Sequence, residues 1–84
     1  MKIYWFQGAK NIIGKRLKHL RLTHNPPLTQ KQVAEKLQLA GYEFDSLTIL
    51  RIEKGDRFVP DYEVVALAQL FHVSYEYLLE GKTD

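Results

Sequence analysis

The sequence has 84 residues, a length typical of one domain, and a chain of this size buries about 60% of its unfolded surface when it folds. It contains no cysteine, which excludes disulfide bonds and thiolate metal ligands and leaves helix packing as the expected source of stability. No apolar run approaches the ~20 residues that span a membrane, and the first residues lack a signal-peptide pattern. We therefore expect a cytoplasmic protein that contacts no membrane.

The net charge of +2 hides an uneven distribution. Residues 1–36 carry eight basic side chains and one acidic side chain, a balance of +7. Residues 37–84 carry four basic and nine acidic side chains, a balance of −5. Such a division favours one surface that faces a polyanion such as nucleic acid, although solvated charge on helix surfaces would give the same counts.

Residues 1–8 are predicted to form an N-terminal arm, because they are rich in aromatic residues and lack helical periodicity. The arm could include a short strand. Its aromatic side chains either fold back onto the core or make a dimer contact, and the sequence leaves this choice open. These side chains are Tyr4, Trp5 and Phe6.

The remaining residues, 9–84, are predicted to form one compact all-α domain. Apolar residues recur every three to four positions, and capping residues stand at the ends of these stretches. In the first stretch Ile13 and Leu17 lie on one face, and Gly14 indicates a close neighbour, because glycine there costs about 1 kcal/mol relative to alanine. The five predicted helices cover about 9–23, 29–40, 45–54, 61–71 and 74–80.

The predicted helix ends rest on local capping patterns. Thr29 and Gln32 have the spacing of a capping box, and Asp45 is the expected N-cap of the third helix. Asp61 is expected to cap the fourth helix, whose apolar residues cover more than half of its circumference, so we predict that it is central and buried. Ser74 is expected to cap the fifth.

The third predicted helix has two faces of different character. Ile49 and Ile52 face inward, and Gly55 ends the helix. The outer face carries Leu47, Leu50, Arg51 and Lys54.

Four motifs in register resemble the Cro/repressor-type (XRE) helix-turn-helix family. They are Ile13-Gly14-x-Arg16-Leu17-x-x-Leu20-Arg21, Leu28-Thr29-Gln30-x-x-Val33-Ala34-x-x-Leu37, Ile49-x-x-Ile52-Glu53-x-Gly55 and Val73-Ser74-x-x-Tyr77-Leu78-Leu79. The resemblance covers about residues 9–80 and implies the five-helix lambda-repressor-like fold. One departure is the segment between Leu37 and Ile49, which is longer than the usual turn of the family.

The resemblance implies that the third helix enters the major groove of double-stranded DNA, where base edges carry distinct donor, acceptor and methyl patterns. The residues expected to contact bases are Asp45, Ser46, Leu47, Leu50 and Arg51. The residues expected to contact phosphates are Gln30, Lys31, Lys54 and Arg57. Arg21 and Glu53 are expected to form a structural ion pair between the first and third helices.

Other roles are open for several of these residues. The two leucines would suit thymine methyl groups, but they could instead pack against the long turn. Asp45 could serve only as a cap, and the lysines could serve only solubility.

The function implied by the resemblance is sequence-specific regulation of transcription, as a repressor of bacterial or phage type that acts as a homodimer on two half-sites. The candidate dimer contacts are Tyr4, Trp5, Phe6, Tyr75, Tyr77 and Leu79. The alternative is a protein-interaction module on the same fold, such as an antitoxin that binds a toxin through exposed Leu47, Leu50, Tyr42 and Phe44. We expect no enzymatic activity, metal or cofactor, because the three histidines are scattered and no nucleophile–base set is visible.

Overall fold

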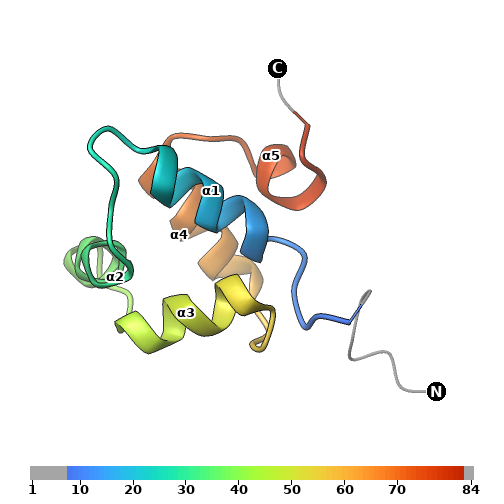
Figure 1. The fold of residues 1–84 in the computed structure, drawn as a ribbon, viewed down its shortest axis with the longest axis horizontal. Coiled ribbons are helices and arrows are strands. Elements are labelled where there is room, and N and C mark those ends of the chain that lie inside the picture. Colours follow the sequence, from blue (N-terminus) through green and yellow to red (C-terminus); the bar gives the residue numbers. More distant parts are fainter. Residues whose placement is uncertain (1–7, 83–84) are drawn as a thin grey trace.

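The computed structural model describes residues 8–82, and these form an all-α domain as predicted (Figure 1). Tyr4, Trp5 and Phe6 of the predicted arm lie outside the described residues. The helices are α1 (Gly14–Thr23), α2 (Gln30–Leu39), α3 (Ser46–Lys54), α4 (Asp61–Phe71) and α5 (Tyr75–Glu80).

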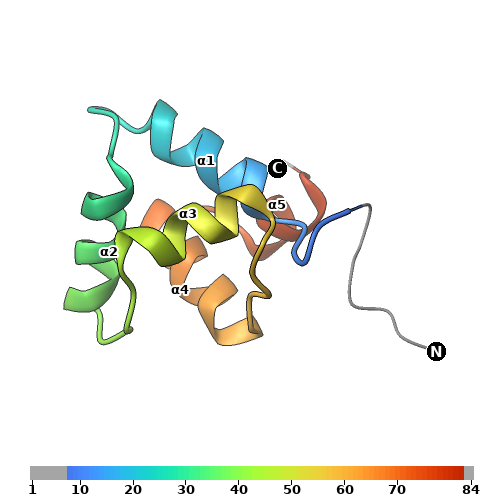
Figure 2. The same cartoon turned by 60° about the horizontal axis from the view of Figure 1, so that its bottom comes forward.

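Helix α3 is held by two neighbours, because it packs against both α1 and α2. Helix α4 packs against α2 and α5, and it lies behind α1 and α3 in Figure 1. The view in Figure 2 shows α3 running across the front of the domain, with α1 above it and α4 below it. One long side of α3 is therefore open to solvent while the opposite side faces the other helices.

A single apolar cluster lies between the helices, and each helix contributes to it at helical spacing. Burying these side chains is the main source of stability in a domain without disulfides. The buried apolar residues are Ile13, Leu17, Leu28, Val33, Ala34, Leu37, Phe44, Ile49, Ile52, Val64, Ala66, Leu67, Ala68 and Leu78.

Helix α4 is buried along one side, as its composition predicts, with Leu67 wholly buried. Its apolar positions are nevertheless not equivalent, because Val65 is only half-buried while Ala66 is buried. A charged residue, Glu63, is also buried on this helix. The apolar pattern alone does not predict this carboxylate.

Three of the predicted caps are present. Thr29 and Gln32 form a reciprocal capping box: the Thr29 hydroxyl accepts from the Gln32 amide, and the Gln32 side chain accepts from the Thr29 amide. Asp45 accepts from the Thr48 amide at the start of α3, and Ser74 accepts from the Tyr77 amide at the start of α5. These bonds satisfy amide groups that have no partner within their own helix.

One predicted helix start and one predicted cap are wrong. Helix α1 begins at Gly14 rather than near residue 9, because the Asn11 side-chain oxygen binds the amides of Ile13 and Gly14 and starts the helix there. Asp61 does not cap α4: Pro60 occupies the N-cap position without a side-chain bond, and Asp61 is the first helical residue. Proline suits this site because it has no amide hydrogen and its φ is fixed.

Gly14 allows α1 to approach the last turn of α3, as its position inside an apolar stretch predicts. A β-carbon at Gly14 would overlap with the backbone carbonyl oxygen of Ile52, and the Glu53 carbonyl is also close. Both obstacles are backbone atoms, which cannot rotate away. The two helices can therefore keep this separation only with glycine at position 14.

We expect Gly14→Ala to destabilise the domain by about 1–3 kcal/mol, because the overlap forces α1 and α3 apart. Helix propensity alone would predict a gain of about 1 kcal/mol, so the sign of the change decides between the two effects. Urea unfolding of the variant beside Lys18→Ala, an exposed position of the same helix, provides the measurement. A Gly14→Ala variant more stable than wild type would contradict the close approach.

Candidate nucleic-acid interface

The two sides of α3 differ in burial as the sequence predicts. Ile49 and Ile52 are wholly buried. On the opposite side Leu47 is 48% exposed and Leu50 is 36% exposed, and Arg51 is exposed as well. This outer face therefore presents two apolar side chains and a guanidinium to solvent.

Both ends of α3 are fixed by local geometry. At the start, one carboxylate oxygen of Asp45 accepts from the Thr48 amide at 2.7 Å and from the Thr48 hydroxyl at 2.8 Å. These two hydrogen bonds lower the pKa of Asp45, with a smaller contribution from nearby Arg51. At the end, Gly55 adopts a left-handed conformation (φ 78°), which glycine adopts without strain.

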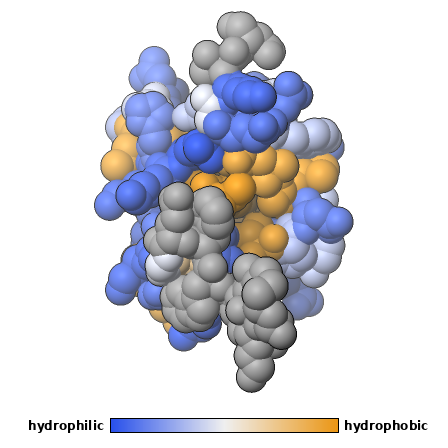
Figure 3. All heavy atoms as spheres, turned by 90° about the vertical axis from the view of Figure 1, so that its right-hand side faces the viewer, coloured by the Kyte–Doolittle hydropathy of each residue, from blue (hydrophilic) through white to orange (hydrophobic). Residues whose placement is uncertain are grey.

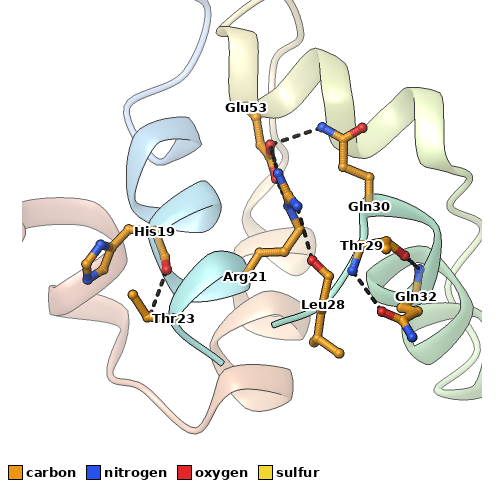
Figure 4. Close-up of polar contacts among 8 residues, drawn as sticks. All are labelled: His19, Arg21, Thr23, Leu28, Thr29, Gln30, Gln32 and Glu53. Atoms are coloured by element: carbon orange, nitrogen blue, oxygen red, sulfur yellow. Dashed lines mark hydrogen bonds and ion pairs between the residues drawn. The ribbon is translucent and has the colours of Figure 1, made fainter. Parts of the chain in front are cut away.

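An ion pair joins the last turn of α3 to α1 (Figure 4). Arg21 Nε lies 2.7 Å from Glu53 Oε2, and Arg21 Nη2 lies 2.9 Å from Glu53 Oε1. The side chains are 11% and 3% exposed, respectively. The ion pair expected between these two residues is thus present, in the two-bond geometry that suits a guanidinium and a carboxylate.

Two further groups complete this cluster. Arg21 Nη1 donates to the Leu28 carbonyl at 3.1 Å, and Gln30 Nε2 donates to Glu53 Oε1 at 3.1 Å. Figure 4 shows the three side chains arriving from α1, α2 and α3. Glu53 raises the pKa of Arg21 through its hydrogen bonds, which holds the guanidinium in its charged form. The cluster fixes the orientation of α3 relative to both neighbours.

A second cluster, which the sequence does not predict, holds the same end of α3. Asn11 Nδ2 donates to the Ile52 carbonyl at 3.1 Å and to the Arg57 carbonyl at 2.9 Å. Its oxygen accepts hydrogen bonds from the amides of Ile13 and Gly14. All four hydrogen-bonding positions of the carboxamide are therefore used. The partners of its nitrogen lie more than 40 residues away along the chain, and no local pattern identifies them.

The predicted phosphate contacts divide into two groups. Lys31 and Lys54 are exposed near the start of α2 and the end of α3. Gln30 is half-buried and bound to Glu53, and Arg57 forms a two-bond ion pair with Glu63, whose side chain is 8% exposed. This pair also explains the buried carboxylate on α4. In the sequence, the burial of Glu63 is indicated only by its place next to Val64 and four positions before Leu67, which are both apolar.

The long segment between α2 and α3 is folded onto the domain. Gln38 Nε2 donates to the Phe44 carbonyl, the Tyr42 amide donates to the Leu37 carbonyl, and Gly41 has a positive φ of 96°. Phe44 is buried in the core and Tyr42 packs against it. The expectation that Phe44 is exposed for a protein partner is therefore wrong, because its ring fills space in the core.

An open hollow of about 600 Å³ lies beside this segment at the start of α3. Its lining carries two acidic side chains and one tyrosine, and its mouth is wide. The hollow is too open to enclose a ligand. Its lining residues are Gln38, Gly41, Tyr42, Glu43, Phe44, Asp45 and Thr48.

The candidate dimer contacts on α5 are partly accessible. Tyr75 and Leu79 are exposed, whereas Tyr77 is half-buried and packs against the core. Figure 3 views the side of the domain where α5 and the start of the described chain lie, and apolar atoms gather on it between hydrophilic ones. Arg16 joins these segments, because it donates to the carbonyls of Ile12 and Leu78.

Among residues 8–82 there is no group of three or more metal-ligating side chains. No helix of the described part is long and apolar enough to cross a membrane. The described residues also leave no buried side-chain nitrogen or oxygen atom without a hydrogen-bond partner.

The chain matches no protein-family model, no curated protein and no solved structure. The roles of the residues described above therefore rest on their geometry, charge and exposure.

We expect Glu53→Ala to lower the free energy of unfolding by about 3 kcal/mol, because it leaves the buried Arg21 guanidinium without its counter-charge. Glu35→Ala removes a glutamate from the exposed side of α2 and should change stability by at most about 0.5 kcal/mol. Thermal unfolding of the two variants makes the comparison. Equal melting temperatures would show that the pair does not stabilise the fold.

We expect the stabilising effect of the Asp45 cap to depend on pH. Because the folded-state pKa lies below the ordinary value of 3.8, the effect is fully present above that value and is lost as pH falls through the lowered pKa. The difference in melting temperature between wild type and Asp45→Ala should therefore be largest near neutral pH and shrink in acid. Asp45→Asn keeps an acceptor that does not titrate, so its advantage over Asp45→Ala should stay constant with pH.

Proposed function

We propose that this protein is a sequence-specific double-stranded DNA-binding regulator of transcription that reads the major groove with α3. We further propose that it belongs to the Cro/repressor-type helix-turn-helix family and acts as a repressor. The observation that carries the proposal is the outer face of α3, which is exposed while the rest of the helix is locked to α1 and α2. An α-helix fits the width of the major groove.

The side chains of α3 have suitable chemistry for this role. Arg51 can donate two hydrogen bonds to the two major-groove acceptors of guanine. Ser46 lies at the exposed start of the helix, where a hydroxyl can donate or accept. Asp45 is a weaker candidate for a base contact, because one of its oxygens already binds Thr48.

Phosphate contacts would come from the cations beside α3. Exposed Lys31 and Lys54 stand at the ends of the two helices of the motif, and they fit this role better than Arg57, which is paired with Glu63. Gln30 can approach a phosphate only if its amide leaves Glu53 or serves both groups. Contacts of this kind fix the position of the protein on DNA and make affinity fall steeply with salt.

The proposal includes a homodimer, because one helix the length of α3 reads only a few base pairs. Two copies would bind half-sites about 34 Å apart, one turn of DNA, on a near-palindromic sequence. Exposed Tyr75 and Leu79 on α5 are the dimer candidates within the described residues.

A protein-interaction role, as in an antitoxin, is the second candidate. Leu39 favours it, because this side chain at the end of α2 is 90% exposed. Leu47 and Leu50 could extend such an apolar contact, with Tyr42 at its edge. Selection of bound sequences from a random DNA pool separates the two functions, because only a sequence-specific DNA reader enriches a motif.

We expect Arg51→Ala to bind the selected sequence about 5- to 150-fold more weakly and to lose its preference for guanine at one position, since a bidentate contact contributes about 1–3 kcal/mol of discrimination. Lys54→Ala is the matched control, because loss of a phosphate contact should weaken binding to all sequences alike and reduce its salt dependence. Mobility shifts at two salt concentrations and a repeated selection measure both effects. An Arg51→Ala variant that enriches the wild-type motif would contradict the assigned role.

A further inference from the structure

Two leucines dominate the exposed face of α3. Leu47 and Leu50 are three positions apart, so their side chains lie on neighbouring turns of one face. Roughly half and a third of these side chains are in contact with solvent, whereas Ile49 and Ile52 supply the inward packing. The leucines therefore contribute little to the core of this domain and have apolar surface available for a partner.

The polar groups near these leucines are partly engaged. The Thr48 hydroxyl donates a hydrogen bond to Asp45, and the same Asp45 oxygen caps the helix. Arg51 lies directly after Leu50 and carries several hydrogen-bond donors at the surface. A partner that fits this face must therefore present apolar groups beside hydrogen-bond acceptors.

The charges beside the leucines favour an anionic partner. Arg51 and Lys54 lie on the same side of α3 as the leucines, and both are exposed. A purely apolar ligand would make no use of these cations. DNA meets both requirements, because its phosphates are anionic and the thymine 5-methyl group is an apolar group on the major-groove edges of its bases.

We infer that Leu47 and Leu50 read thymine through its 5-methyl group, so that each half-site contains thymine beside the guanine contacted by Arg51. This inference rests on the proposed function and names the bases that the same helix selects. Discrimination then comes from apolar contact with methyl groups as well as from the hydrogen bonds of Arg51.

The test replaces single thymines of the selected duplex with deoxyuridine, which removes one methyl group and keeps every hydrogen-bonding atom. We expect affinity to fall about fourfold at each contacted thymine, because one methyl group is no longer buried. At such a position, the protein should bind a duplex with 5-methylcytosine more tightly than a duplex with cytosine. Fluorescence anisotropy with labelled duplexes measures the affinities.

Protein variants assign the effect to individual side chains. Each of the variants Leu47→Ala and Leu50→Ala should lose the sensitivity at one position. There it should bind the thymine duplex and the deoxyuridine duplex with equal affinity. Leu39→Ala is the matched control, because it truncates an exposed leucine on another helix and should keep the full sensitivity. All three leucines are at the surface, so thermal unfolding should confirm that the variants remain folded.

The outcomes separate the inference from the function on which it rests. A protein that enriches a motif but binds deoxyuridine and thymine equally at every position would overturn the methyl readout and leave the DNA-binding proposal intact. Deoxyuridine sensitivity that survives in both Leu47→Ala and Leu50→Ala would also overturn it. A folded protein that enriches no motif, for example one whose leucines bind a protein partner, would overturn both.

Discussion

The ion pair between Arg21 and Glu53 is the interaction on which the position of α3 depends. It lies where α1, α2 and α3 meet, and Gln30 joins it through Glu53. A pair this deep is costly to desolvate, so it adds little stability over an apolar substitute, but neither charge tolerates loss of the other. It therefore fixes one arrangement of the helices more than it strengthens the domain, and a DNA-reading helix would need such a fixed arrangement.

The same end of α3 is also held by close contacts that involve no charge. Gly14 brings α1 against the backbone of Ile52, and Asn11 binds the same stretch through its carboxamide. The end of α3 is thus held by an ion pair on one side and by backbone contacts on the other. Its outer face is left for apolar and cationic side chains that make no comparable contacts within the domain.

Spacing alone predicts features whose causes are local, whereas the pair of Arg21 and Glu53, 32 positions apart, follows only from the family resemblance. The caps at Thr29, Asp45 and Ser74 depend on residues three positions away, and the inward face of α3 follows from helical spacing. The two bonds that Asn11 donates depend on how distant segments fold together, and the pairing of Arg57 with Glu63, six positions apart, depends on the path of the connection between α3 and α4. Aromatic residues in a long turn were ambiguous for the same reason, since whether Phe44 is buried depends on space left by other helices.

The burial of Phe44 has a consequence for how the molecule could meet a partner. Because the turn places a ring in the core and is tied back by Gln38, α2 and α3 are expected to move as one body. Little of the turn then needs to be ordered when the outer face of α3 is covered. The conformational entropy that a loose turn of this length would lose on association has already been lost during folding, so more of the contact energy can appear as affinity.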